Sequence, residues 1–373
     1  MAVLRWTAAS QPGVAVQSYK PRRGGQVLAT LGPGVLSYAD PGMSGTYDVL
    51  VTFADGSTVT SAPKVYANPG AAPGAMPKQG ISTGYTILNR TSAGMDEELD
   101  NVVEVANGKP CFVRLDSVNA TSEQNKLDVL MPKVLARGLT PLLILWGSVN
   151  APLTPGTFAA DQVAKWGTAC NHYEVCNEPD LHLWTPNAYA DFVAAVGPQV
   201  HATPGKRVIA GALWKGDNRT PVVPPQEFAT ALATRAAGHF DYLSGHLYDN
   251  PYSRGTWNIW DMFFPAINGV TSSYPTNNVR TILDSAGLAN VGIMSTENGG
   301  KYNVDFAPSS AGQYTESQVA DFVSRAFDLV AAGLLATHLV YAMRNDSVAG
   351  FGMLRSDLTQ RPAYTVFRDR AVS

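Results

Sequence analysis

From residue 81 onward, short apolar runs alternate with amphipathic segments along the chain. Most of these runs are continuously apolar, which is typical of parallel strands that are covered on both faces. A strand followed by a helix, repeated eight times in about 290 residues, indicates a closed (β/α)₈ barrel of the TIM type. The predicted strands are residues 84–88, 111–116, 141–147, 173–178, 207–214, 242–248, 291–297 and 337–343.

The segments between the predicted strands carry helix start and stop signals. Residues 95–108 and 122–138 both end in glycine after a last apolar turn, which is a usual helix stop. Thr315 with Gln318 three residues later predicts a capped start for a helix over residues 315–333. The rival architecture is a doubly wound open sheet, but no GxGxxG pattern follows any predicted strand. We therefore predict the barrel over residues 81–373.

Residues 1–67 have a different pattern and predict a small all-β domain of sandwich-like type. A turn signal at Asp55-Gly56 separates two strand-like runs, which indicates a hairpin. Residues 68–80, NPGAAPGAMPKQG, predict a linker because proline, glycine and alanine dominate them. Attachment, sugar binding and packing against the barrel remain open as roles for this domain. The apolar residues that alternate on one face of the first run are Tyr47, Val49, Val51 and Phe53.

Composition and charge exclude several classes of protein. The 373 residues suit one large domain and one small one, and 45% apolar with 15% charged residues excludes a disordered chain. A net charge of −3 gives no basic field for nucleic acid or anionic membrane. No run of about 18 apolar residues is present, so we expect no membrane span. The first residues, MAVLRWTAASQPGVAV, lack the apolar region of a signal peptide.

The cysteine pattern favours buried free thiols. The three cysteines are Cys111, Cys170 and Cys176, and none belongs to a CxxC pair. Cys111 and Cys176 lie in apolar strand-like runs, so we expect thiols in the core and no zinc site. One disulfide stays open as the alternative.

Two glutamates end predicted strands four and seven. Glu178 is followed by Pro179, which fixes it at a strand exit, and Glu297 is followed by Asn298 and two glycines that permit tight turns near a ligand. On a closed ring these strands face each other across the mouth, where barrel active sites lie. Two carboxylates on one cleft are the apparatus of glycoside hydrolysis, and a gap of about 5–5.5 Å between them indicates retention of configuration.

The other strand ends carry side chains that suit a sugar. Asn177 can bond a sugar hydroxyl, while Arg114 and Tyr248 can bond Glu297. His246 and Tyr341 complete the predicted polar set around the mouth. Indole rings stack on the apolar faces of sugars, and five of the seven tryptophans fall at or just after predicted strand ends. These are Trp146, Trp184, Trp214, Trp257 and Trp260.

Several of these residues also have a structural interpretation. Arg114 can form an ion pair with Glu174, which lies inside a predicted strand and needs a partner there. His246 can be a satisfied core histidine, and Trp146 and Trp214 can pack within the barrel. The sequence leaves both interpretations open for these four residues.

The run HYEVCNEPDL, residues 172–181, resembles the acid/base strand of retaining clan A glycoside hydrolases, which are (β/α)₈ enzymes. It is most similar to glycoside hydrolase family 39, in which Glu-Val-Trp-Asn-Glu-Pro is typical. The resemblance covers roughly residues 80–370. It implies that Glu178 is the acid/base, that Glu297 in MSTENGG is the nucleophile, and that Asn177 is the neighbouring substrate-binding amide.

Further motifs carry the same resemblance. His246 and Tyr248, in GHLY, match the His-x-Tyr strand of the clan, and Arg114, in FVRLD, matches its strand-two arginine. Residues 351–367, FGMLRSDLTQRPAYTVF, resemble the final segment of such barrels, which precedes the last helix. The chain departs from the family at Cys176, where tryptophan is usual, and in strand eight, where Tyr341 replaces the tryptophan common in the clan. The N-terminal β-domain is not a standard part of the family.

The sequence therefore predicts a retaining glycosidase that cleaves a β-linked oligo- or polysaccharide by double displacement, without a metal or organic cofactor. A bacterial exopolysaccharide or capsule is one predicted substrate, and the expected setting is extracellular or on a phage virion. The alternatives are a non-catalytic carbohydrate-binding barrel and a transglycosylase. The sequence does not predict an oligomeric state.

Overall fold

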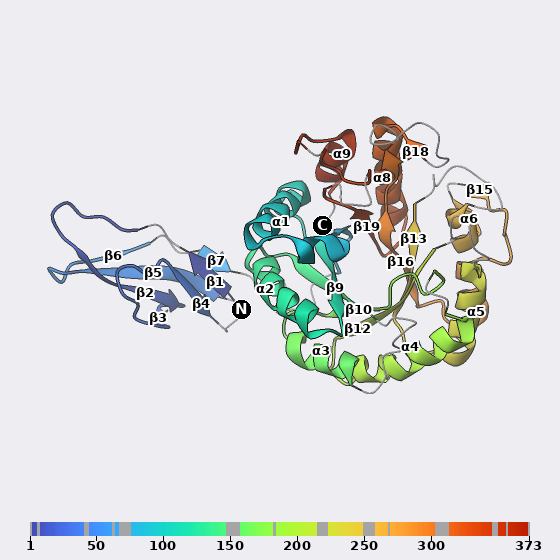
Figure 1. The fold of residues 1–373 in the computed structure, drawn as a ribbon, viewed down its shortest axis with the longest axis horizontal. Coiled ribbons are helices and arrows are strands. Elements are labelled where there is room, and N and C mark those ends of the chain that lie inside the picture. Colours follow the sequence, from blue (N-terminus) through green and yellow to red (C-terminus); the bar gives the residue numbers. More distant parts are fainter. Residues whose placement is uncertain are drawn as a thin grey trace. The chain divides into compact units, whose positions relative to one another are not determined.

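In this computed structural model the chain divides into two compact units, Met1–Ala75 and Met76–Ser373 (Figure 1). None of the described helices is long and apolar enough to cross a membrane. The structure describes residues 2–5, 8–40, 45–61, 64–66, 76–146, 157–181, 184–214, 223–248, 258–267, 269–302, 313–344, 350–355 and 357–371.

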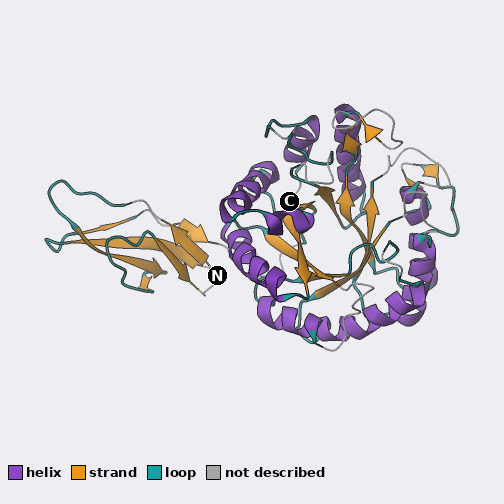
Figure 2. Cartoon of the chain, in the orientation of Figure 1, coloured by secondary structure: helices purple, strands orange, loops and turns teal. Residues whose placement is uncertain are grey.

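The described part of the N-terminal unit is all-β (Figure 2). One antiparallel sheet has the order β3-β2-β5-β6, with β7 also paired to β5, and a second sheet joins β1 to β4. The predicted hairpin is confirmed, because β5 and β6 pair antiparallel across the turn at Asp55. Tyr19 packs with three of the predicted inward residues, Val49, Val51 and Phe53, in a small core. The strands are β1 Ala2–Arg5, β2 Val16–Arg23, β3 Gln26–Val27, β4 Ser37–Asp40, β5 Gly45–Phe53, β6 Thr58–Thr60 and β7 Lys64–Tyr66.

In the second unit, eight described strands close into a parallel barrel with helices around it (Figure 1). The strands follow one another around the ring in chain order, so the predicted (β/α)₈ architecture is confirmed. Two small pairs of strands lie outside the barrel: β14 Ala266–Ile267 with β15 Val270–Thr271, and β17 Lys301–Tyr302 with β18 Gln313–Tyr314. The barrel strands are β8 Gln79–Ser82, β9 Phe112–Val118, β10 Thr140–Trp146, β11 His172–Val175, β12 Arg207–Leu213, β13 Tyr242–Leu247, β16 Gly292–Asn298 and β19 Thr337–Tyr341.

The helices begin and end where local signals place them. Thr315 caps the start of α8 in a full capping box with Gln318, as predicted. Asn107 ends α1 in the left-handed conformation, one residue before the predicted stop at Gly108. The helices are η1 Gly84–Asn89, α1 Ser92–Ala106, α2 Thr121–Ala136, α3 Phe158–Trp166, α4 Pro186–His201, α5 Pro225–Arg235, α6 Ile259–Phe263, α7 Val279–Ser285, α8 Glu316–Ala331 and α9 Pro362–Arg370.

The structure corrects the position of the first barrel strand. The apolar pattern predicts that strand at residues 84–88, but these belong to the 3₁₀ helix η1, and the strand is Gln79–Ser82, which begins inside the predicted linker. The strand contains a glycine because β8 lies tightly against its neighbours. A Cβ atom on Gly80 would lie 2.6 Å from Phe112 Cβ. Ile87 is apolar for a different reason, because it packs in the core between the barrel and its helices.

The barrel interior is layered along the strands. An apolar layer contains Phe112, Leu142, Ile209, Met294 and Leu339, which form a core separate from the larger one between barrel and helices. Above this layer, towards the carboxyl ends of the strands, the inward-facing residues become polar and charged. The predicted site therefore rests on a closed apolar floor.

All three cysteines are buried free thiols, as predicted.

Candidate active site

A buried ion pair lies beneath the mouth of the barrel. Arg114 on β9 and Glu174 on β11 have side chains only 1% and 0% exposed, and Arg114 Nε donates to Glu174 Oε2 at 2.5 Å. Ser244 and Thr296 donate to the other oxygen, Oε1, at 2.6 and 2.7 Å. Burial by itself lowers the pKa of Arg114, but the charges of Glu174 and Glu297 outweigh it and raise the pKa. Both carboxylate oxygens of Glu174 therefore have hydrogen-bond donors, as a buried pair requires.

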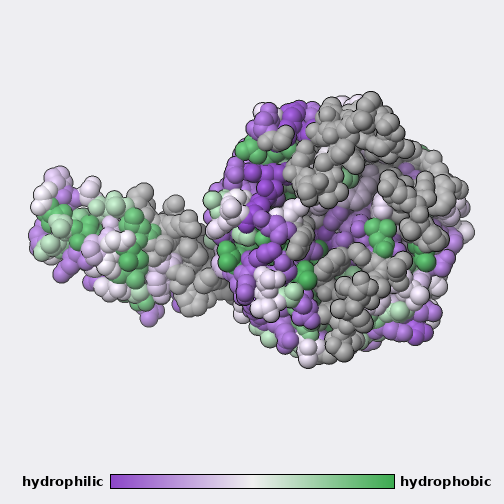
Figure 3. Space-filling model, viewed as in Figure 1, coloured by the Kyte–Doolittle hydropathy of each residue, from purple (hydrophilic) through white to green (hydrophobic). Residues whose placement is uncertain are grey.

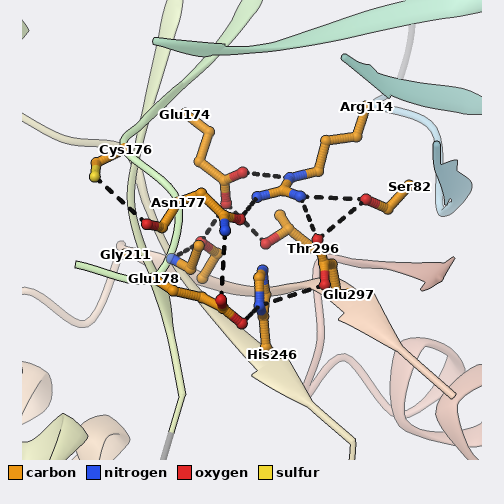
Figure 4. Close-up of polar contacts among 12 residues, drawn as sticks. Ser82, Arg114, Glu174, Cys176, Asn177, Glu178, Gly211, His246, Thr296 and Glu297 are labelled. Atoms are coloured by element: carbon orange, nitrogen blue, oxygen red, sulfur yellow. Dashed lines mark hydrogen bonds and ion pairs between the residues drawn. The ribbon is translucent and has the colours of Figure 1, made fainter. Parts of the chain in front are cut away.

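The rest of the Arg114 guanidinium contacts Glu297, Ser82 and Asn177 (Figure 4). Nη1 donates to Glu297 Oε1 at 2.6 Å and to Ser82 Oγ at 3.2 Å, and Nη2 donates to Asn177 Oδ1 at 2.7 Å. Arg114 thus serves both interpretations that the sequence left open, because it is an ion-pair partner of Glu174 and a ligand of Glu297. One rigid, planar cation fixes the relative positions of three other strands or their ends.

Glu297 is held by donors on both oxygens. Oε1 accepts from Arg114 and from Ser82, the latter at 3.4 Å, and Oε2 accepts from the hydroxyl of Tyr248. Burial, and then the negative charge of Glu297, raise the pKa of Tyr248 well above its ordinary value. Tyr248 therefore keeps its proton and acts as a donor. These contacts aim the carboxylate and balance its charge.

A register shift between β13 and β16 brings Glu297 into this position. Gly245 pairs with Ser295, but His246 pairs with Glu297, so Thr296 is the extra residue of a bulge. A bulge lets consecutive residues point to the same side of a sheet. As a result, Thr296 bonds Glu174 while its neighbour Glu297 bonds Arg114.

Glu178 lies beyond the end of its strand rather than at the predicted strand end. β11 stops at Val175, and Cys176 and Glu178 take positive φ values of 66° and 44°. Two left-handed residues cost energy and are typical of functional sites, and here they turn Asn177 and Glu178 over the mouth. The predicted strand over residues 173–178 is too long because the alternation of apolar residues does not report the sign of φ.

His246 joins the two glutamates (Figure 4). Its Nδ1 atom lies 2.6 Å from Glu178 Oε1 and 3.5 Å from Glu297 Oε2. Oxygen atoms of the two glutamates lie within 4.8 Å of each other and of this nitrogen. Burial by itself lowers the pKa of His246, but the charges of Glu297 and Glu178 outweigh it and raise the pKa.

The same three residues form a group with metal-ligand spacing among the described residues. A histidine nitrogen and two carboxylate oxygens are ligands that divalent transition metals accept. The spacing equally suits one carbon atom approached by two carboxyl groups, which is the arrangement in glycosidases. The hydrogen bonds from Arg114 and Tyr248 already occupy both oxygens of Glu297, which favours the second interpretation.

The predicted aromatic residues fall into different places. Trp260 is fully buried and stacks with Phe264, so it cannot line the mouth; α6 carries it into the core behind the barrel. Trp184 is partly buried and packs on Phe192 of α4, with ring centroids 5.2 Å apart. Trp214 follows β12, partly exposed, with its backbone N–H bonded to Asp180.

The remaining aromatic predictions concern the rim. Trp146 ends β10, but its side chain is outside the described part, and Trp257 lies outside the described residues. Tyr341 ends β19 and is partly exposed. Phe351, which the sequence did not single out, contacts Tyr341 and Tyr248 with ring centroids 5.6 and 5.5 Å apart. Figure 3 shows a hollow with hydrophilic residues inside it over the centre of the barrel.

Sequence reasoning missed the small hydroxyl residues that support the site. Ser244 and Thr296 satisfy Glu174, and Ser82 contacts both Arg114 and Glu297. Ser244 lies two residues before His246 on a correctly predicted strand, so the alternation of side chains indicates its inward direction. Ser82 could not be found in this way, because the apolar pattern places the first strand at residues 84–88.

Comparison with known protein families and with curated proteins finds no match. Solved structures do match. A family 39 glycoside hydrolase from the gut symbiont Bacteroides cellulosilyticus WH2 is 16% identical, with a TM-score of 0.54 over 97% of this chain and 78% of that one. A GH2 β-galacturonidase from Eisenbergiella tayi is 12% identical, with a TM-score of 0.53 over 96% of this chain and 67% of that one. A Bacteroides uniformis β-glucuronidase is 11% identical, with a TM-score of 0.54 over 97% of this chain and 47% of that one.

These comparisons define the class of fold. The chain has a (β/α)₈ barrel of the kind found in glycoside hydrolases, and at these identities the likeness concerns the fold alone.

Proposed function

We propose that this chain is a retaining glycoside hydrolase that cleaves a β-linked oligo- or polysaccharide, with Glu297 as nucleophile and Glu178 as acid/base. The observation that carries the proposal is the approach of the two carboxyl groups, because one oxygen of each lies within 4.8 Å of one oxygen of the other. Carboxyl groups about 5–5.5 Å apart serve retention, whereas inversion needs about 6.5–9.5 Å to admit a water.

In the first step, a lone pair of the Glu297 carboxylate attacks the anomeric carbon of the bound sugar. The bond from that carbon to the glycosidic oxygen breaks, and the proton of Glu178 moves to the departing oxygen. A glycosyl ester on Glu297 results. Arg114, Ser82 and Tyr248 hold Glu297 in the direction that this attack requires.

In the second step, the carboxylate of Glu178 takes a proton from water. The oxygen of that water attacks the anomeric carbon, and the ester bond to Glu297 breaks. The product keeps the configuration of the substrate, and both glutamates return to their starting state. His246 contacts Glu178 at 2.6 Å and so keeps this carboxyl group over the reacting bond in both steps.

The solved structures support the proposal at the level of chemistry. Those reported above are described as a glycoside hydrolase, a β-galacturonidase and a β-glucuronidase. The choice of a β-linked substrate also rests on the resemblance of residues 172–181 to retaining clan A enzymes. The extracellular or virion-associated setting stays a prediction.

The test is digestion of a panel of bacterial polysaccharides, with mass analysis of the products, by the wild type and by Glu178→Gln and Glu297→Gln. We expect both variants to lose turnover by about 10³-fold or more while melting temperature and circular dichroism stay native. Glu227→Gln, an exposed position on α5, is the matched control and keeps full activity. Wild-type turnover by either active-site variant contradicts the proposal, and products longer than the substrate indicate transfer to a sugar instead of water.

A further inference from the structure

Asp116 is a third carboxylate at the mouth, and the mechanism above does not use it. It lies on β9 two residues beyond Arg114, so both side chains face the barrel interior. Ile144 of β10 is its partner in the parallel register. The residue is 7% exposed, which makes it nine-tenths buried.

In the described part of the chain, Asp116 has none of the donors that its neighbours have. Among the described residues, no N–H or O–H group donates to its carboxylate, whereas Glu174 and Glu297 accept from several groups. The oxygens of Asp116 also keep contact with solvent. In this they differ from Oδ1 of Asp180, which is buried and has no hydrogen-bond partner among the described residues. A buried carboxylate that is open on one side and unsatisfied by protein is arranged to accept hydrogen bonds from a ligand.

The charges around Asp116 are mostly negative. The pKa of Asp116 is raised to about 6. Burial is the largest cause, Arg114 opposes it, and the charges of Glu297, Glu174 and Glu123 add to it. The guanidinium of Arg114 is already shared among Glu174, Glu297 and Asn177.

Arg344, the cation that follows β19, is engaged by Glu97 of α1 at 2.9 Å. In the described part of the mouth, an incoming carboxylate would therefore meet like charge at Asp116 and an arginine that is already shared.

Resting on the proposed function, we infer that Asp116 accepts hydrogen bonds from hydroxyl groups of the sugar ring held against Glu297, and that it makes the site select a neutral sugar over a uronic acid. An ionised carboxylate accepts but cannot donate, so hydroxyl groups are its natural ligands and such bonds are strong. This selectivity differs from the uronide substrates named for several barrels of the same fold.

The probes are isofagomine and uronic isofagomine, which differ only in that a carboxylate of the second replaces a hydroxymethyl group of the first. Their binding is measured by calorimetry at pH 7.5. We expect the wild type to bind isofagomine at least tenfold more tightly, and Asp116→Asn to reduce that ratio below threefold. Asp128→Asn, the same change at an exposed position on α2, keeps the wild-type ratio. Tighter binding of the uronic form by the wild type, or an unchanged ratio in Asp116→Asn, overturns the inference.

Polysaccharide digestion separates this inference from the proposed function. We expect kcat/KM of Asp116→Asn to fall at least tenfold on the substrate that the wild type digests, with no loss of melting temperature. If the wild type digests a glycan and Asp116→Asn has the same kcat/KM, the inferred role of Asp116 is wrong and the proposed function stands. The same conclusion follows if the wild type digests a glycan but binds neither probe. If no glycan is digested and neither probe binds, the proposed function fails and this inference falls with it.

Discussion

Three glutamates of one barrel have different surroundings, and these surroundings decide what each can do. Glu174 is fully buried and accepts from Arg114, Ser244 and Thr296, so it is a structural counter-ion. Glu297 is 11% exposed and aimed by donors on both oxygens, which suits a nucleophile. Glu178 is the most exposed of the three at 19% and contacts His246, which suits a group that exchanges a proton with substrate and water.

Arg114→Met tests the structural half of this assignment. Removing the guanidinium leaves Glu174 and Glu297 as buried charges without their common partner, so we expect the free energy of unfolding to fall by about 3–5 kcal/mol. Urea denaturation measures it. Arg235→Met removes an exposed ion pair with Asp191 and should cost less than about 1 kcal/mol. Equal losses in the two variants contradict the account of the buried pair.

Asp116→Asn should stabilise the protein while it impairs binding. The folded-state pKa of Asp116 is about 6 against an ordinary 3.8, so its protonated form favours the folded state. The wild type therefore loses unfolding free energy as the pH rises from about 4 through 6. The loss reaches up to about 3 kcal/mol, since one pKa unit corresponds to about 1.36 kcal/mol. In urea titrations, the unfolding free energy of the variant should exceed that of the wild type at pH 7 but not at pH 4. An equal difference at both pH values contradicts the raised pKa.

At the scale of elements, the sequence predicts whatever depends on periodicity and caps. Seven barrel strands and the capping box at Thr315 follow from local patterns. The pattern misses the remaining strand, β8, because close packing against Phe112 requires Gly80, and a strand with glycine and few apolar residues has the composition of a linker. Packing across the barrel, and not local propensity, makes residues 79–82 a strand.

The candidate site also has parts that the sequence predicts and parts that it does not. Strand-end position alone predicts that Glu178, Glu297, Arg114 and His246 lie in one region. The bulge at Thr296 and the left-handed residues after Val175 are not predictable from local patterns, because they depend on contacts between strands far apart in the sequence. The support from Ser82 is hidden from the sequence for the same reason.

Gly80→Ala tests the packing of β8. The new Cβ would lie 2.6 Å from Phe112 Cβ and 2.8 Å from Leu339 Cγ, so β8 or β9 must shift. We expect a loss of about 1–3 kcal/mol in unfolding free energy. Turnover should fall as well, because β8 carries Ser82 and β9 carries Arg114. Gly32→Ala, where a Cβ meets nothing within 4 Å, should be neutral in the same urea and activity assays. A neutral Gly80→Ala would show that β8 is loosely packed.

At the scale of the whole molecule, the chain consists of two units with separate cores. Tyr19 and three neighbours form the core of the first unit, while the barrel has its own interior and helix-facing cores. All of the residues proposed for catalysis belong to the second unit. The chemistry should therefore not depend on the first unit.

Residues 76–373 expressed alone should fold and act on short soluble oligosaccharides. We expect kcat/KM within about threefold of the full chain and the same melting transition for the barrel, because separate cores unfold independently. Calorimetry and product analysis measure these two quantities. A truncated chain that aggregates or is inactive would show that the first unit is part of the catalytic fold.

Covalent trapping identifies the residue that attacks the sugar. The wild type is incubated with the 2-deoxy-2-fluoro glycosyl fluoride of the sugar found in the digest, and the labelled protein is mapped by peptide mass spectrometry. We predict one glycosyl group per chain, bonded to Glu297, and no label on the Glu297→Gln variant. A label on Glu178 or on any other residue, or a product of inverted configuration with no label, would contradict this prediction.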